Sequence, residues 1–319
     1  MKAVRYDSYG SPDVLKIVEV DAPTPAADEI LVRVHAAAVS RGDCAFRSGR
    51  PLFARILTGV LRPKRHTVGQ DFAGVVEAVG ADVTEFAVGD RVFGGLAFFG
   101  HGSGTQAELV CVPESAPVAH IPDGLDFVEA AALGDGPFNS MNGLRPARTM
   151  RGRRILVYGG SGSIGTAGIQ LAKHYGLHIT AVTDAKHIDL VRSLGADAVI
   201  DRAQEDFRKR GERYDLIFDA VGKLTFGHCR RALVPGGIYL PTDGLANALW
   251  WLATKRFGSR KVFFEIPRYN KQLALDIKQL VEDGEYRPII DRTYPLDEVV
   301  EASRYVETGQ KTGNVVLTI

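Results

Sequence analysis

Short apolar runs separated by Pro, Gly and Asp turns occupy the first third of the chain. They are LKIVEV, EILVRVHAAAV, DFAGVVEAVG, DRVFGGL and AELVCVP, all between residues 15 and 113. Runs of this length and spacing predict the strands of a small, barrel-like β domain. Around residues 122–135 the pattern changes to an Ala-rich helical segment that contains DFVEAAAL.

From Arg154 onward, apolar strands alternate with segments of helical length. The strands are RILVYG, HITAVT, AVI, YDLIFDAVG and GGIYL. Because parallel strands need long crossovers, this alternation predicts an α/β fold with a parallel sheet and helices on both faces. The tail has helical periodicity and ends in the strand NVVLTI, so its pattern alone allows it to close the first domain or to extend the second.

Composition and charge favour a globular protein with a small-molecule partner. The 319 residues are 45% hydrophobic and 24% charged, with a formal net charge of +1. Without a long Lys/Arg run or a long apolar run, we expect no nucleic-acid partner and no membrane span. The N-terminal MKAVRYDSYG has no apolar signal core, which predicts a cytoplasmic location,.

The cysteines do not form the pattern of a metal or disulfide site. Cys44, Cys111 and Cys229 lie far apart and include no CxxC pair. Cys44 and His66 are two possible ligands without a third, and we therefore expect no metal.

The segment ILVYGGSGSIGTAGIQLAK places glycines three residues apart between a strand and a helix. Glycine there allows a tight turn and lets a pyrophosphate approach the helix N-terminus, where free N–H groups favour an anion. A turn that needs glycine only for steric reasons is the alternative, but the βαβ context favours a dinucleotide. The residues expected to contact it are Gly159, Ser161, Gly162, Ser163, Ile164 and Gly165.

The residues after the next two strands bear on which dinucleotide is bound. An acidic residue after the second strand favours NAD, whereas Lys or Arg accommodates the phosphate of NADP. Asp184 could contact a ribose or cap the next helix, and Lys186 and Arg202 are basic. We expect NADPH, with NADH possible, held in part by Thr183, Lys186 and Arg202.

Several segments, spread over nearly the whole chain, resemble the medium-chain dehydrogenase/reductase superfamily in its zinc-free quinone oxidoreductase branch. Among them are AAAVSRGDCAFRSG, GQDFAGVVEAVGADVTEFAVGDRVFG, GGSGSIGTAGIQLAK and GQKTGNVVLTI. The resemblance implies a doubly wound Rossmann domain, residues 126–266, inserted in a mostly β GroES-like catalytic domain, residues 1–125 and 267–319. It also implies that the tail returns to the first domain, that a cleft separates the two domains, and that the protein is a homodimer.

The resemblance also points to particular site residues. Ser40 and Asp43 lie where relatives carry Asn and Asp, although Asp43 could equally be a turn cap, and Asn139 replaces a Thr beside the nicotinamide. Zinc enzymes of the superfamily carry Cys and His in the segments that match Ser40 and Gln70, so we expect no zinc. Further positions that the resemblance places near the cofactor are Gly222, Phe263 and Asn314, whereas Asp71 reads as a structural carboxylate.

These observations predict a zinc-independent, NADPH-dependent oxidoreductase. The hydride would pass to a quinone or an α,β-unsaturated carbonyl in the cleft, because without a Lewis acid the acceptor must already be electrophilic. The unusual segment GDGPFNSMN motivates an alternative, a pathway-specific enoyl or alkenal reductase of biosynthesis. A third hypothesis is a dinucleotide-binding protein with little catalysis, like the lens crystallins that resemble this family.

Overall fold

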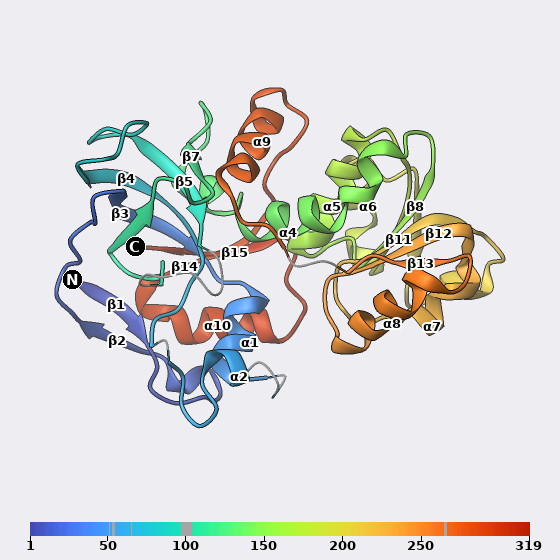
Figure 1. Cartoon of the computed structure of the whole chain (residues 1–319), viewed down its shortest axis with the longest axis horizontal. Coiled ribbons are helices and arrows are strands. Elements are labelled where there is room, and N and C mark those ends of the chain that lie inside the picture. The colour runs from blue at the N-terminus through green and yellow to red at the C-terminus, as the bar shows by residue number, and fades with distance from the viewer. Residues whose placement is uncertain (51, 53–54, 65, 97–103, 265–266) are drawn as a thin grey trace. The chain divides into compact units, whose positions relative to one another are not determined.

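The computed structural model describes residues 1–319 except 51, 53–54, 65, 97–103 and 265–266 (Figure 1). The chain forms two compact units, each with its own sheet and core. The first unit comprises residues 1–135 and 269–319, and the second comprises residues 136–268.

The sheet of the first unit is mostly antiparallel, in the order β14-β15-β3-β4-β5-β7, with β6 also paired to β3. Strand β3 alternates between buried and more exposed positions, so Ile30, Val32 and Val34 all point into the core,. A separate hairpin pairs β1 with β2. The strands are β1 (Lys2–Arg5), β2 (Lys16–Glu19), β3 (Glu29–Ala38), β4 (Asp71–Val79), β5 (Arg91–Gly95), β6 (Leu109–Pro113), β7 (Val118–His120), β14 (Ile290–Pro295) and β15 (Asn314–Thr318).

The C-terminal tail belongs to this first unit. Strand β15 pairs with β3, and helix α10 contributes Val299, Ala302 and Val306 to a core shared with the N-terminal residues Val4 and Tyr6. The tail therefore closes the sheet that the first residues begin. The helices of this unit are α1 (Arg41–Ser48), α2 (Arg55–Thr58), α3 (Phe127–Ala131), α9 (Lys271–Glu282) and α10 (Val299–Glu307).

The second unit is built on a parallel sheet in the order β10-β9-β8-β11-β12-β13. The first strand of this unit, β8, lies in the middle of the sheet, with β9 on one side and β11 on the other. The chain therefore adds strands first in one direction from β8 and then in the other. Doubly wound sheets bind their ligands at this switch point. The strands are β8 (Arg154–Tyr158), β9 (His178–Thr183), β10 (Ala198–Asp201), β11 (Tyr214–Asp219), β12 (Leu233–Pro241) and β13 (Lys261–Val262).

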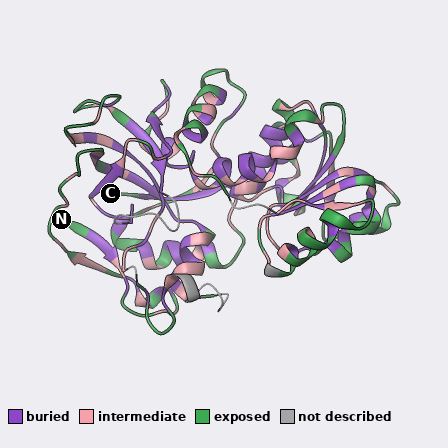
Figure 2. Cartoon of the chain, in the orientation of Figure 1, coloured by how far each residue is buried: buried purple, intermediate pink, exposed green. Residues whose placement is uncertain are grey.

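Helices cover both faces of this sheet, with α5 and α6 on one side and α7 and α8 on the other (Figure 1). The strands are largely buried, whereas α8 is largely exposed (Figure 2). The predicted α/β fold, a doubly wound sheet beside a mostly β domain, is confirmed. The helices are α4 (Asp135–Gly143), α5 (Ser163–His174), α6 (Ile188–Ser193), α7 (Phe226–Cys229) and α8 (Leu245–Arg256).

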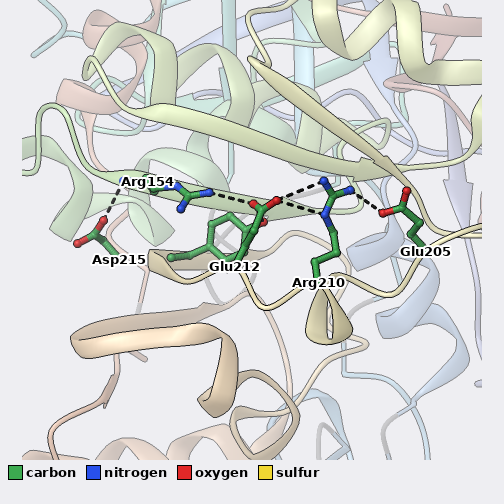
Figure 3. Close-up of polar contacts among 6 residues, drawn as sticks. Arg154, Glu205, Arg210, Glu212 and Asp215 are labelled. Carbon is green, nitrogen blue, oxygen red and sulfur yellow. Dashed lines mark hydrogen bonds and ion pairs between the residues drawn. The ribbon is translucent and has the colours of Figure 1, made fainter.

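An ion-pair network ties together the N-terminal ends of two neighbouring strands of this sheet (Figure 3). The Arg154 backbone N–H donates to Asp215 at 2.9 Å, and its guanidinium donates to Glu212 at 2.9 Å. Arg210 pairs with both Glu212 and Glu205. Each of these carboxylates therefore has a cationic or amide donor, at the end of the sheet opposite the switch point.

Among the described residues, no helix has both the length and the apolar character needed to cross a membrane.

Candidate functional site

The turn between β8 and α5 requires glycine at two of its positions. Gly159 has a φ of 81°, and a Cβ there would lie 2.0 Å from Val221 Cγ2. A Cβ on Gly165 would lie 2.0 Å from the Gly159 carbonyl oxygen. The backbone N–H groups of Gly159 and Gly160 both donate to the Val182 carbonyl at 3.0 Å, which fixes the turn to β9. The predicted glycine pattern thus forms a tight strand-to-helix turn.

The start of α5 is open to an anion. Gly162 occupies the N-cap position, no side chain caps the helix, and a Cβ there would meet only the Gly159 carbonyl oxygen, at 3.9 Å. The first-turn N–H groups and the helix dipole favour a negative charge at such an end. The first turn of α5 is also fixed to α4, because the Ser140 hydroxyl donates to the Ile164 carbonyl at 2.8 Å. This uncapped cradle fits a dinucleotide pyrophosphate.

The sheet brings the other residues predicted in this unit to the same edge. Thr183 ends β9 and Gly222 follows β11, and both strands pair in parallel with β8 beside Tyr158. Gly222 has a φ of 71°, and its N–H donates to the buried Asp219 carboxylate at 3.0 Å. The Thr183 hydroxyl is buried without a hydrogen-bond partner in the described part of the chain.

Asp184 forms an ion pair with Arg202, which the sequence pattern did not indicate. Asp184 stands at the N-cap of the short 3-10 helix Ala185–His187, but its side chain makes no capping hydrogen bond. Instead it accepts from Nε of Arg202 and, at 3.0 Å, from Nη2. Hydrogen bonding to Arg202 lowers the pKa of the Asp184 carboxyl. The helix-cap interpretation of this side chain is therefore wrong. The nearby Lys186 is exposed.

Phe263 and Asn314 lie in different units. Phe263 follows the edge strand β13, its N–H donates to the Tyr239 carbonyl at 2.9 Å, and the Arg145 guanidinium lies 5.5 Å from its ring centroid. Asn314 begins β15 in the first unit, and its amide donates to the Ile289 carbonyl at 3.1 Å. Ser161 precedes α5 in the glycine turn, as expected.

Of the predicted catalytic residues, Ser40 and Asp43 contact each other directly. They form a capping box at the start of α1: the Asp43 N–H donates to Ser40 Oγ at 3.0 Å, and the Ser40 N–H donates to the Asp43 carboxylate at 2.8 Å. Burial raises the pKa of the Asp43 carboxyl to about 7, against the lowering effect of the Ser40 bonds. Asn139 is half-buried on α4 in the second unit.

Two further carboxyls of the first unit lie near Asp43. Asp71 begins β4 and is 3% exposed, and Asp135 is the first residue of α4. Burial, followed by the Asp135 and Asp43 charges, holds the pKa of Asp71 well above its usual range. The sequence pattern alone did not predict a role for Asp135, which lies within the unusual segment GDGPFN.

Comparisons with known proteins identify the family of the chain. The family described as alcohol dehydrogenase GroES-like domain matches residues 26–123, and the family described as zinc-binding dehydrogenase matches residues 194–317. The chain is 34% identical to 2-methylene-furan-3-one reductase of Solanum lycopersicum, over 99% of this chain and 79% of that protein. The chain belongs to the medium-chain dehydrogenase/reductase superfamily. It lies in the quinone oxidoreductase-like branch of that superfamily.

Two other members of the superfamily support this placement. The NADPH-dependent alkenal/one oxidoreductase of Arabidopsis thaliana chloroplasts is 32% identical over 99% of this chain and 79% of that protein. The structure of the quinone oxidoreductase from Coxiella burnetii superposes with a TM-score of 0.89 at 28% identity, covering 100% of this chain and 99% of the other.

One of the matching superfamily descriptions includes zinc, but the residues present do not suit that ion. Gln70 donates its amide to the Leu96 carbonyl at 3.0 Å, and Ser40 donates its hydroxyl to Asp43 at 2.9 Å. Burial, followed by the Asp43 charge, raises the pKa of the Cys44 thiol to about 12, so the thiolate that zinc prefers is disfavoured,. Within the described ranges, no three His, Cys, Asp or Glu side chains are placed to hold a metal ion.

Proposed function

We propose that this quinone oxidoreductase-like chain is a zinc-independent reductase that uses NADPH to reduce a quinone or an α,β-unsaturated carbonyl. The observation that carries the proposal is the uncapped start of α5 beside the glycine turn, at the switch point of the parallel sheet. The names of the relatives supply the acceptor classes: a quinone in one case, and an alkenal or enone in the other two.

The residues of the second unit would hold the cofactor. The N–H groups of Ser163, Ile164 and Gly165 at the start of α5 would bind its pyrophosphate,. Gly159 and Gly222, which have positive φ angles, would shape the turns beside the cofactor, and the Thr183 hydroxyl would gain a hydrogen-bond partner. When bound, NADPH supplies the hydride, and catalysis comes mainly from holding the acceptor against it.

The Asp184–Arg202 pair bears on the choice between NADPH and NADH. A carboxylate after β9 can accept from a ribose 2′-hydroxyl, whereas a guanidinium attracts a 2′-phosphate. In this chain the two groups neutralise each other, and the exposed Lys186 remains as an additional cation. We therefore propose NADPH as the preferred cofactor and NADH as a weaker one.

The remaining site assignments follow the same proposal. Ser40, Asp43 and Asn139 would face the acceptor, and Phe263 and Asn314 would flank the cofactor. Residues 1–125 with 267–319 would act as the GroES-like catalytic domain and residues 126–266 as the dinucleotide-binding domain, a division supported by the two compact units. A cytoplasmic location stays a prediction.

A homodimer is also proposed, through the edge of the parallel sheet. β13 is the last strand in the sheet order, and α8 and the residue after it carry large apolar side chains that are exposed, Leu249 at 68%, Leu252 at 57% and Phe257 at 75%. Exposed apolar groups beside an open sheet edge are typical of a subunit interface. Light scattering of the purified protein should give twice the chain mass, and Leu252→Lys should give the monomer mass.

Steady-state assays test the function itself. Purified protein with NADPH should reduce simple quinones, enones and alkenals, and metal analysis should find zinc far below one ion per chain. Strong preference for alkenals over quinones would favour the biosynthetic alkenal reductase; the relatives' names support its acceptor class. Tight NADPH binding without turnover of any acceptor would instead favour the crystallin-like binding protein.

A further inference from the structure

Three carboxyls of the first unit, from three different elements, lie close enough to act on one another. Asp43 comes from α1, Asp71 from the start of β4 and Asp135 from the start of α4. Asp43 is 6% exposed and Asp71 is 3% exposed, whereas Asp135 is half-buried. The Asp135 charge disfavours ionisation of both other carboxyls.

The backbone at Gly134 leaves room for the Asp71 carboxyl. A Cβ on Gly134 would lie 2.0 Å from Asp71 Oδ1, so only glycine leaves room for the carboxyl there. The Asp135 backbone N–H donates to the Asp71 carboxyl. The other oxygen, Oδ2, is buried and has no hydrogen-bond partner among the described residues. An ionised carboxylate buried with an unsatisfied oxygen would be strongly destabilising.

A second buried acceptor next to this group also lacks a donor. Gln106 is 1% exposed, and its amide donates to the Ala38 carbonyl at 3.3 Å, but its Oε1 has no partner in the described part of the chain. The Gln106 side chain packs against Gly69, where a Cβ would lie 2.8 Å from Gln106 Cγ, and the Gly69 N–H bonds to Asp43. Asp71 Oδ2 and Gln106 Oε1 are thus both buried acceptors without a donor in the part of the chain that the structure describes.

A partly buried lysine lies beside the group. Lys311 donates its Nζ to the Gly313 carbonyl at 2.5 Å, burial lowers the pKa of its amine, and the Asp135 and Asp291 charges oppose that lowering. The charged groups acting on Asp71 are the carboxyls of Asp135 and Asp43. Of the three carboxyls, Asp71 is therefore the one whose ionisation is opposed by burial and by two neighbouring carboxyls.

We propose that Asp71 carries a proton at neutral pH, and that Asp43, Asp71 and Asp135 form a proton-holding cluster that serves the reduction of unsaturated carbonyls. This inference rests on the proposed function. Asp135, the half-exposed member, would be the outlet of the cluster, and Asp71 would be a positioning residue that stores the proton.

The proton balance of the reaction requires such a source. When a hydride reaches the β-carbon of an enone, the electron pair of the carbon–carbon double bond moves to the carbonyl oxygen and leaves an enolate. The enolate takes one proton from the cluster, a new C–H bond forms at the α-carbon, and one carboxyl becomes a carboxylate. Water then returns the proton. A reduced quinone can instead take its protons directly from water, so quinones do not need the cluster.

A comparison of the two acceptors tests the role of Asp71. Asp71→Asn keeps the shape of the side chain but removes the stored proton. It should lower kcat with an enone by about 10²-fold, the usual size of a general-acid effect, and lower kcat with a quinone by less than about threefold. The matched control is Asp90→Asn, in the same unit, where the Asp90 carboxylate accepts from the Ala87 N–H at 2.8 Å. It should change neither rate.

A readout without cofactor or acceptor tests the protonation itself. In the full chain labelled with ¹³C at aspartate side chains, NMR at neutral pH should show a protonated carboxyl from Asp71 and a partly protonated one from Asp43. Asp71→Asn should remove the fully protonated signal, and Asp90→Asn should leave it in place. The proposal is overturned if Asp71→Asn removes no protonated signal, or if it leaves the enone rate unchanged or lowers both rates equally. A wild type that reduces neither acceptor would refute the proposed function, and the NMR signal would still decide the proton on Asp71.

Discussion

The molecule contains two groups of carboxylates in opposite settings. Glu205, Glu212 and Asp215 lie at the surface of the second unit, interleaved with two arginines (Figure 3). Asp43 and Asp71 are buried in the first unit, and the charges that raise their pKa values are those of other carboxyls. Both groups consist of Asp or Glu side chains, but they differ in their exposure to water and in whether a cation lies beside them.

The pKa values move in opposite directions as a result. Burial would raise the pKa of Glu212, but the Tyr214 hydroxyl and the guanidinium groups of Arg210 and Arg154 outweigh it and lower the value. Burial raises the pKa of Asp43 to about 7. Carboxylates with cationic partners therefore act as fixed structural charges, whereas those without such partners can hold protons near neutral pH.

Among the substitutions, the largest loss of stability at a fixed pH is expected where a buried charge loses its partner. The Arg47 side chain is 1% exposed and pairs with Glu307 of α10. Glu307→Ala would leave this guanidinium buried and unpaired, which should lower the free energy of unfolding by about 3 kcal/mol in urea denaturation. Glu301→Ala, on the exposed side of the same helix, is the control and should change it by less than about 0.5 kcal/mol. Equal effects would show that burial does not decide the outcome.

The pH dependence of stability should differ in sign between the two settings. The Asp43 pKa is raised from 3.8 to about 7, so the native state holds a proton that the unfolded chain has released between these values. The free energy of unfolding should then fall by up to about 4 kcal/mol as the pH rises from about 4 to 7. Asp43→Asn should flatten this slope in denaturation at a series of pH values.

Asp90 provides the opposite case for the same measurement. The Ala87 N–H, with a further contribution from His120, lowers the pKa of Asp90. Its contribution to stability should therefore be present above about pH 4 and lost as the pH falls below that value. If Asp90→Asn and Asp43→Asn altered the pH profile in the same direction, the comparison would be wrong.

A smaller effect is expected at Asp184, which has its own arginine. Asp184→Asn removes the carboxylate and frees Arg202 for a 2′-phosphate. The ratio of NADPH to NADH affinity should rise about tenfold, the size of one charge-assisted hydrogen bond. Titration calorimetry with both cofactors measures this ratio. A ratio that falls would mean that Arg202 does not face the 2′ position.

The smallest effect is expected in the surface network. Arg210→Met keeps the aliphatic stem but removes the pairs to Glu205 and Glu212. The free energy of unfolding should fall by less than about 1 kcal/mol, and the difference should shrink at high salt because exposed ion pairs are screened. A loss as large as that of Glu307→Ala would erase the distinction between the two settings.

Local patterns were sufficient to predict the strands and helices of both units and the glycine turn, whereas the return of the tail to the first unit was predicted only by the family resemblance. Period-two and helical patterns follow from backbone geometry within a few residues, and Gly159 and Gly165 are required by contacts within one turn,. Both features depend on short sequence separations, which are visible in a single sequence.

The carboxyl cluster could not be predicted in the same way. Asp43, Asp71 and Asp135 are far apart in sequence and meet only because the first unit folds α1, β4 and the start of α4 together. Asp184 and Arg202 are separated by 18 residues, and their pairing depends on the parallel register of β9 and β10. The helix-cap interpretation of Asp184 considered only its neighbours in sequence, and it failed for that reason.

The central claim, that a dinucleotide pyrophosphate binds at the start of α5, is tested most directly by calorimetric titration of NADPH into Gly162→Asp and Gly162→Asn. Gly162 has a φ of −79°, which either residue can adopt, and both residues are good N-caps, so the helix should remain intact,. If the claim is right, the charged variant should bind NADPH at least about tenfold more weakly than the neutral one, by repulsion of the pyrophosphate. Equal affinity of the two variants, unchanged from the wild type, would contradict it.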